Sequence, residues 1–84
     1  MTRRLVLIEW HDGRRPMDTW SFIDDMTGFS PVVCQSVGWL IHDADDVKVL
    51  SPNIGDLKSE REQSMGAIQI PARCVISITN LRTE

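Results

Sequence analysis

The sequence predicts one small domain, residues 1–84, of the mainly β class, with five to six short strands wrapped into an open barrel. Three observations predict this class. Short apolar runs rich in β-prone residues alternate with turn-forming residues, two of these runs form an expected hairpin, and a proline interrupts the final pair of runs. A chain of 84 residues holds only one domain with a modest core.

The first strand is expected at Leu5–Trp10, where a run of apolar residues ends at a His-Asp-Gly sequence. A long loop should follow from Asp12 to Pro31. It contains glycines, prolines and isolated charges around the segment Trp20–Ile23, which indicates one short strand or helical turn inside the loop.

The clearest strand is residues 32–42, which only Gly38 interrupts. Residues of one parity should share a face, and the more apolar parity is expected to face the core. That set is Val33, Val37, Trp39 and Ile41. The aspartate-rich residues 43–46 predict a turn, so the strand at Val47–Leu50 should return as a hairpin partner.

The last third of the chain predicts a solvated loop or one helical turn over residues 53–65, then a strand at Ala67–Ile70. Pro71 cannot donate to a sheet ladder, so this strand must break there, with a 3₁₀-like turn over residues 71–73. The final strand is expected at Cys74–Thr79. Alternation places Ile76 and Ile78 on one face, and Val75 and Ser77 on the other.

A strand, a proline turn and a second strand also end SH3-like barrels, so Gly66–Ile78 resembles the closing half of an SH3 domain. The acidic-aromatic motif and paired tryptophans of peptide-binding SH3 domains are not recognisable elsewhere. The resemblance therefore implies an SH3-like fold and no ligand. An Sm-like arrangement of the same strands is the alternative.

Five motifs spread over nearly the whole chain resemble a family of small proteins encoded by tailed bacteriophages and prophages. They are EWHD, the later TW, CQSVGWLI, VLSPNIG and IQIPARCVISI. The strand with SVG, an aromatic residue and leucine is fairly specific, whereas Asp12–Pro16 stands where that family commonly has a serine-rich stretch. The resemblance implies a phage origin, and hence the host cytoplasm, without an established activity.

The composition argues against two function classes. Nine basic residues against twelve acidic ones give a net charge of −3, without the basic excess that nucleic-acid binding usually requires. No apolar run approaches the roughly 20 residues of a membrane span, so we expect a cytoplasmic protein without a membrane partner. Cys34 and Cys74 lie outside any zinc spacing and are expected to be small buried residues, with a disulfide as the alternative.

Catalytic motifs are missing from the sequence. His11 and His42 each precede an aspartate, but adjacent residues of a strand point to opposite faces, so neither pair is a dyad unless the fold brings the histidines together. The aspartates of residues 43–46 lack the remaining ligand pattern of a calcium loop. We therefore expect no enzyme, no catalytic residue, no metal and no cofactor.

A core this small does not easily enclose three tryptophan side chains, so at least one of them should be exposed. Trp10 and Trp20 flank the long loop and are the better candidates for contact, whereas Trp39 is expected mainly to pack. The arginines would form one patch if the loop folded toward the end of the chain; dispersed surface arginines are the alternative. The candidate partner-binding residues are Trp10, Asp12, Arg14, Arg15, Trp20, Trp39 and Arg73.

The sequence thus favours a non-enzymatic phage accessory protein that binds through its long first loop. The expected partner is a host protein or a small nucleotide-like signal. We also expect a homo-oligomer, because open barrels expose strand edges that subunit pairing covers. The alternative is an Sm-like or SH3-like nucleic-acid-binding module that stacks bases on aromatic side chains and holds phosphates with Arg14, Arg15 and Arg73.

Overall fold

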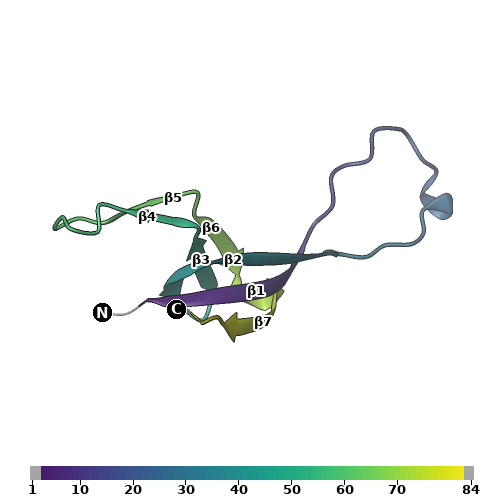
Figure 1. The fold of residues 1–84 in the computed structure, drawn as a ribbon. Coiled ribbons are helices and arrows are strands. Elements are labelled where there is room, and N and C mark those ends of the chain that lie inside the picture. Colours follow the sequence, from purple (N-terminus) through teal and green to yellow (C-terminus); the bar gives the residue numbers. More distant parts are fainter. Residues whose placement is uncertain (1–2, 83–84) are drawn as a thin grey trace.

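The fold is that of a computed structural model, which describes residues 3–82. Within that range the chain forms a five-stranded antiparallel sheet in the order β6-β3-β2-β1-β7 and a two-stranded sheet, β4-β5 (Figure 1). The strands are β1 (Arg4–Asp12), β2 (Val32–Asp43), β3 (Val47–Ser51), β4 (Asn53–Gly55), β5 (Gln63–Met65), β6 (Ile68–Pro71) and β7 (Val75–Asn80). Two 3₁₀ turns, η1 (Ile23–Asp25) and η2 (Ala72–Cys74), complete the elements. The mainly β prediction is confirmed.

The five-stranded sheet curls because its two outermost strands are neighbours in the chain. The turn η2 joins β6 directly to β7, although the two strands lie at opposite edges of the hydrogen-bonded order. Within residues 3–82 no ladder pairs β6 with β7, so the sheet stays open and does not close into a barrel. No helix in this range is long and apolar enough to cross a membrane.

The predicted central hairpin is confirmed, as are the first strand and the proline turn. The strands β2 and β3 pair antiparallel, from Trp39 opposite Ser51 to Asp43 opposite Lys48. The strand β1 lies on the other side of β2 over nine register pairs, from Arg4–Leu40 to Asp12–Val32. This three-stranded centre carries most of the core.

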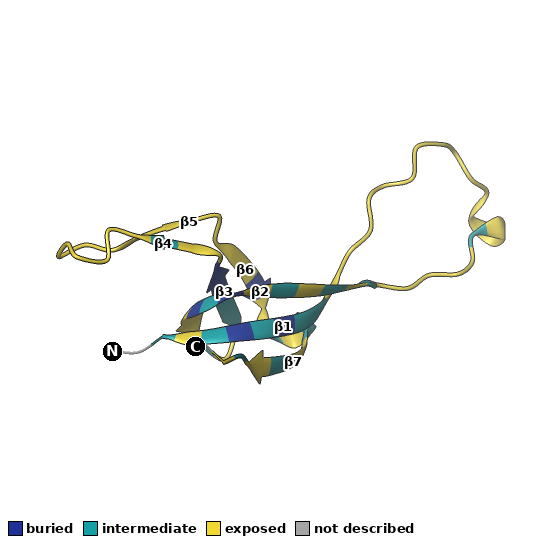
Figure 2. Ribbon diagram, in the orientation of Figure 1, coloured by how far each residue is buried: buried dark blue, intermediate teal, exposed yellow. Residues whose placement is uncertain are grey.

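The core lies on the concave face of the curled sheet. Its buried hydrophobic residues come from four strands, and buried residues are dark blue in Figure 2: Val6, Ile8, Leu40, Leu50 and Ile70. Four partly buried residues pack against them: Trp10, Cys74, Val75 and Ile78. A core this small fits the modest core expected from the length of the chain.

The sequence-based choice of the core face of β2 is wrong. Val33 and Val37 are 57% and 52% exposed, and Trp39 shares their outer face, whereas Gly38 and Leu40 are buried. The partner strand explains this reversal. Val6 lies opposite Gly38 and Ile8 opposite Ser36, so the branched side chains of β1 fill the concave face above small residues of β2.

Gly38 is required by a close approach of two backbones. A Cβ atom built at this position would lie 2.6 Å from the carbonyl oxygen of Ser51 and 3.1 Å from Cγ of Leu50. The chain reaches this point as β3 ends, with Ser51 fully buried. The glycine therefore allows the sheet to bend where β3 crosses β2.

The final strand contains a bulge that alternation could not predict. Ile8 pairs with Ile78 and Trp10 pairs with Val75, so Ile76 is the extra residue and is 46% exposed. The bulge turns Val75 to the same face as Ile78, against the prediction that Ile76 would share that face.

Residues 53–65 form a hairpin of β4 and β5, whereas the sequence predicted a loop or helical turn. The side-chain Nδ2 of Asn53 donates to Met65 O at 3.1 Å, and the side-chain Nε2 of Gln63 donates to Asp56 Oδ2 at 2.7 Å. Ile54 is the one strand residue of this hairpin that is partly buried. Side-chain hydrogen bonds rather than a hydrophobic face support these strands, so their apolar pattern is weak.

The molecule is elongated because two segments project from the sheet in different directions (Figure 1). One is the β4–β5 hairpin and the other is the long loop between β1 and β2. The extents are 57 × 25 × 22 Å and the radius of gyration is 17.1 Å. A compact domain of this length would have a radius of gyration of roughly 12 Å.

Candidate partner-binding arm

The long loop, residues 13–31, forms an arm that stands away from the sheet, and we refer to it as the arm. Its base is fixed by the last register pair of β1 and β2, Asp12 opposite Val32. Just above, Arg14 donates from Nε to Ser30 O at 2.9 Å and from Nη2 to Ser30 Oγ at 3.2 Å. Asp12 Oδ1 accepts the backbone N–H of Gly13 at 2.8 Å. The two Arg14–Ser30 bonds connect the two stems of the arm.

The tip of the arm is a single 3₁₀ turn. In the whole arm, backbone–backbone hydrogen bonds run only from Asp25 N–H to Phe22 O and from Met26 N–H to Ile23 O, at 3.0 and 3.1 Å. Gly28 has a φ of 74°, a left-handed conformation that glycine adopts without strain. The prediction of a short turn inside the loop is confirmed, and the rest of the arm is irregular.

The arm exposes more large apolar side chains than a solvated loop requires. Trp20 is fully exposed, at 103%, and four others are 61–84% exposed: Met17, Phe22, Ile23 and Phe29. Aromatic side chains carry about 150–250 Å² each, so these five side chains expose roughly 800 Å² in total. Met17, Trp20 and Phe22 line one hollow, and exposed apolar patches above a few hundred Å² mark interaction sites.

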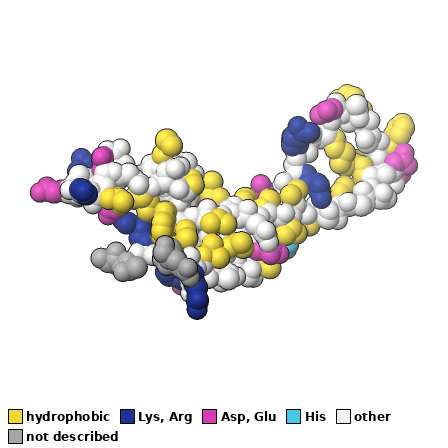
Figure 3. All heavy atoms as spheres, in the orientation of Figure 1, with side chains coloured by type: hydrophobic (Ala, Val, Ile, Leu, Met, Phe, Trp, Pro, Cys, Tyr) yellow, Lys and Arg dark blue, Asp and Glu magenta, His cyan; other side chains and the backbone are white. Residues whose placement is uncertain are grey.

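Part of this surface is concave. Met17, Trp20, Phe22 and Met26 line a hollow of about 670 Å³, with Asp25 at its wall. A second hollow of about 480 Å³ lies nearer the stem, against Arg15 among others. Figure 3 shows hydrophobic side chains gathered on the arm, with basic and acidic side chains at its stem and periphery. The arrangement is an exposed apolar surface bordered by charges of both signs.

Three of the predicted contact residues lie on this arm. Arg14 braces the stem, Arg15 is exposed, and Trp20 is exposed near the tip. Asp12 lies at the base of the arm, where its carboxylate accepts the backbone N–H of Gly13. The sequence analysis named Trp20 as a contact candidate but did not name the other four exposed apolar residues of this loop.

Trp10 has a packing role, although the sequence made it a candidate for contact. It is partly buried against the core, and its indole Nε1 donates to Ser36 Oγ at 3.1 Å. Trp39 is partly exposed on the opposite face of the sheet, directly across from Leu5. The expectation that Trp39 fills the core is therefore wrong, and this indole lies on the outer face.

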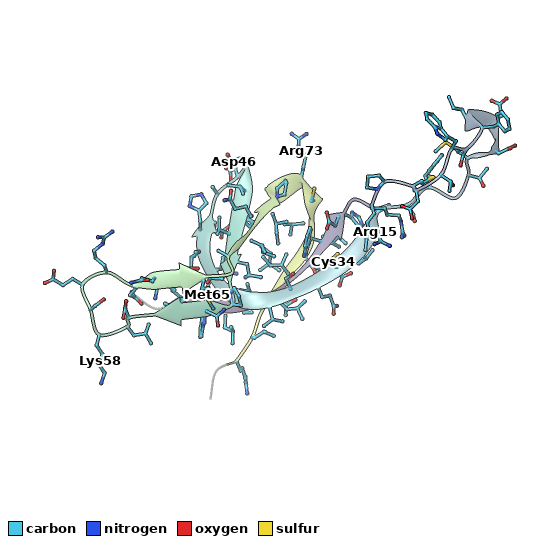
Figure 4. The ribbon with its side chains drawn as sticks, turned by 90° about the horizontal axis from the view of Figure 1, so that it is seen from above. Arg15, Cys34, Asp46, Lys58, Met65 and Arg73 are labelled. Atoms are coloured by element: carbon cyan, nitrogen blue, oxygen red, sulfur yellow. The ribbon has the colours of Figure 1, made fainter. Side chains whose placement is uncertain are left out.

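The arginines do not form one patch. Figure 4 shows Arg15 on the arm and Arg73 on the turn after β6, well apart. Arg3 instead pairs with Glu62 at 2.8 Å, and Arg4 approaches Asp43 at 3.5 Å. The arginines are dispersed over the surface, as the alternative prediction stated.

Two ion pairs shift pKa values, Arg3–Glu62 and Lys48–Asp43. The Arg3 guanidinium donates to Glu62 and lowers the pKa of that carboxyl, while the same pairing raises the pKa of Arg3. The Lys48 ammonium donates to Asp43 and holds its pKa below the usual range. Both pairs lie on the sheet and its hairpin, so they support the body rather than the arm.

The remaining candidates for chemistry stay apart. His11 lies opposite Val33 at the arm end of the sheet, whereas His42 lies opposite Val49 beyond the other end of the β1–β2 ladder. Over residues 3–82 no group of three potential metal ligands comes together. Cys34 and Cys74 are free and partly buried.

No protein-family model matches the chain, and no significant match is found among curated proteins or solved structures.

Proposed function

We propose that this protein is a non-enzymatic binding protein of phage origin, which inserts the apolar tip of its arm into an apolar surface of a host protein. The exposure of Trp20 and its four apolar neighbours on the arm carries this proposal. Exposed aromatic anchors on a loop that a folded sheet holds at its base are the usual form of a protein-contact site.

We also propose an SH3-like build for the sheet, which fits the same role. Three features support it: the strand order, the long loop between the first two strands and the 3₁₀ turn before the last strand. In this arrangement the first long loop is anchored by two adjacent strands and is free at its tip. The arm of this chain is held in that way by Arg14 and the register pair at its base.

The charge of the arm favours a protein partner over a nucleic acid. Between residues 13 and 31 two arginines stand against three aspartates, so the arm has no net positive charge. Arg14 is also occupied by Ser30. For nucleic-acid binding, the arm offers the exposed Trp20 side chain as a surface on which a base can stack. Phosphate contacts would have to come from Arg15.

The test is capture of a partner from nuclease-treated lysate of the host bacterium with the tagged full-length chain. We expect one protein that is retained by the unaltered chain and lost with Trp20→Ala. Leu57→Ala is the matched control, because Leu57 is 68% exposed on the β4–β5 hairpin and lies outside the arm. With the purified partner, truncation of a central aromatic anchor should weaken binding about 30-fold, since hot-spot residues contribute at least about 2 kcal/mol.

Three results would contradict the proposal. One is equal capture by the Trp20→Ala and unaltered chains. Another is capture that nuclease treatment abolishes, with salt-sensitive retention of single-stranded DNA or RNA, which supports the nucleic-acid alternative. The third is thermal stabilisation by a nucleotide without any captured protein, which supports a role in sequestering a small signal.

A further inference from the structure

Over residues 3–82, the last strand of the sheet has one edge that pairs with no other strand. The strand β7 pairs with β1 on one side and ends the order of the five-stranded sheet. Leu81 N–H donates to Leu5 O at 2.8 Å, so antiparallel alternation turns the backbone groups of Ser77 and Thr79 toward β1. The backbone groups of Ile78 and Asn80 therefore point to the open edge.

The strand itself contains none of the residues that normally protect an exposed edge, although Arg4 of β1 donates from Nε to Asn80 Oδ1 at 2.9 Å. Its sequence, VISITN, contains no charge, no proline and no glycine. Proteins usually protect edges with lysine, proline, very short strands or a covering segment. The opposite edge, β6, has such protection, since it is four residues long and ends at Pro71. The open edge of β7 is thus the segment of the sheet best suited to accept another strand.

We propose that β7 pairs antiparallel with β7 of a second copy of this chain, around a two-fold axis at Thr79. A strand without charges meets its own copy without like-charge repulsion, which makes the segment self-complementary. The bulge at Ile76 disrupts the first part of β7 and leaves residues 77–81 as the regular stretch. The midpoint of that stretch is Thr79, which fixes the register.

This register gives hydrogen-bond partners to the backbone N–H and C=O groups at the unpaired edge of β7. Ile78 of each copy faces Asn80 of the other, and each such pair exchanges two N–H···O bonds across the new edge. The two Thr79 residues form the central pair that is not hydrogen-bonded, where side chains of opposite strands lie closest. Threonine pairs are favourable at such positions.

The pairing also joins two apolar surfaces. Thr79 lies beside Leu7 on the outer face of the sheet, and Leu7 lies beside Val37, which is 52% exposed. Leu5 and Trp39 form the next cross-strand pair on this face. In the dimer the outer faces of both copies become one continuous sheet surface. Edge pairing over five residues buries less area than a standard interface of about 1,600 Å², so the dimer should dissociate on dilution.

The first test is the solution mass of the full-length chain by sedimentation from about 1 to about 200 µM. We expect a monomer–dimer equilibrium. Thr79→Lys places two lysines opposite each other at the axis and should give a monomer at every concentration. Gln35→Lys is the matched control: it adds the same charge to the outer face of the sheet, but Gln35 is exposed on β2, away from the pairing edge, so the dimer should persist. A monomeric unaltered chain, or a dimeric Thr79→Lys variant, overturns the proposal.

The second test fixes the register by cross-linking in a Cys34→Ala, Cys74→Ala background. Thr79→Cys should form an intermolecular disulfide on mild oxidation, because opposed residues of a pair that is not hydrogen-bonded lie within disulfide reach. Ser77→Cys should not, since its copies would be about 13 Å apart along the strands. Equal cross-linking of both variants overturns the proposed register. The Trp20→Ala variant should remain a dimer. The dimer proposal and the proposed function of the arm can therefore be refuted independently of each other.

Discussion

The close approach at Gly38 predicts a large loss of stability from the smallest possible side chain. In Gly38→Ala the new methyl carbon would lie 2.6 Å from Ser51 O, which is backbone, and 3.1 Å from the Leu50 side chain. A contact between carbon and oxygen needs more than 3 Å, so β3 must move away by about half an ångström or more. That movement strains the ladder and loosens Leu50 in the core.

Overpacking of this kind costs about 1–3 kcal/mol. A domain of this length is stable by only about 4–12 kcal/mol, so the substitution removes a large fraction of the total. The corresponding fall in Tm is about 4–8 °C for each kcal/mol, which gives a fall of roughly 10 °C for a cost of 2 kcal/mol.

The assay is thermal and urea unfolding followed by far-ultraviolet circular dichroism, with Gly55→Ala as the matched control. Gly55 is also a strand residue, but a Cβ atom there would meet nothing within 4 Å. We expect the Tm of Gly55→Ala to stay within a few degrees of the unaltered chain. A Gly38→Ala protein with an unchanged Tm would refute the reasoning about the bend of the sheet.

Further substitutions probe other parts of the body. Trp10→Phe removes the indole donor to Ser36 Oγ and should lower the free energy of unfolding by about 1 kcal/mol, measured by urea unfolding. Ile70→Ala truncates a fully buried side chain and should cost about 2–5 kcal/mol, enough to unfold much of the population near 37 °C in a thermal scan. The pKa of Asp43 is lowered by Lys48, so its carboxylate stabilises the fold above its ordinary pKa and loses that effect as the pH falls through the folded value. Asp43→Asn should therefore be less stable than the unaltered chain near pH 7, by less than about 1 kcal/mol, and equal to it near pH 2.

The sequence predicted the strands and turns well because their signals are local. The turn at residues 43–46 and the break at Pro71 follow from the chemistry of single residues, and both are found in the structure. A long loop from Asp12 to Pro31 was also predicted, because this segment contains turn-forming residues and only one short candidate for a strand or helical turn; its projection from the sheet was not predicted. The hairpin at residues 53–65 was missed because hydrogen bonds, rather than an apolar face, support it.

The faces of the strands were harder to predict because partner strands decide them. The apolar parity of β2 suggested that Val37 and Trp39 are buried, but the branched residues of β1 occupy the concave face. The exposed position of Ile76 depends on a bulge that only the register with β1 reveals. In both cases the deciding information is the pairing, which a single strand does not contain.

The sequence and the structure both direct attention to the long loop, but they single out different residues in it. Trp20 was chosen because it flanks the loop, while Phe22 and Phe29 were overlooked as contact residues. A count of large apolar residues within the loop would have found them, since a solvated loop rarely needs five. Trp10 was misassigned because its position beside the loop does not show that its indole turns to the core.

The central claim is that the arm is a contact surface that the sheet of its own chain does not cover. Hydrogen–deuterium exchange of the dilute full-length chain tests it most directly. We expect slow exchange for backbone amides of β1, β2 and β3, and near-unprotected exchange between residues 15 and 29 apart from Asp25 and Met26. Protection of the arm amides as strong as that of β1, in the absence of any partner, would contradict the account.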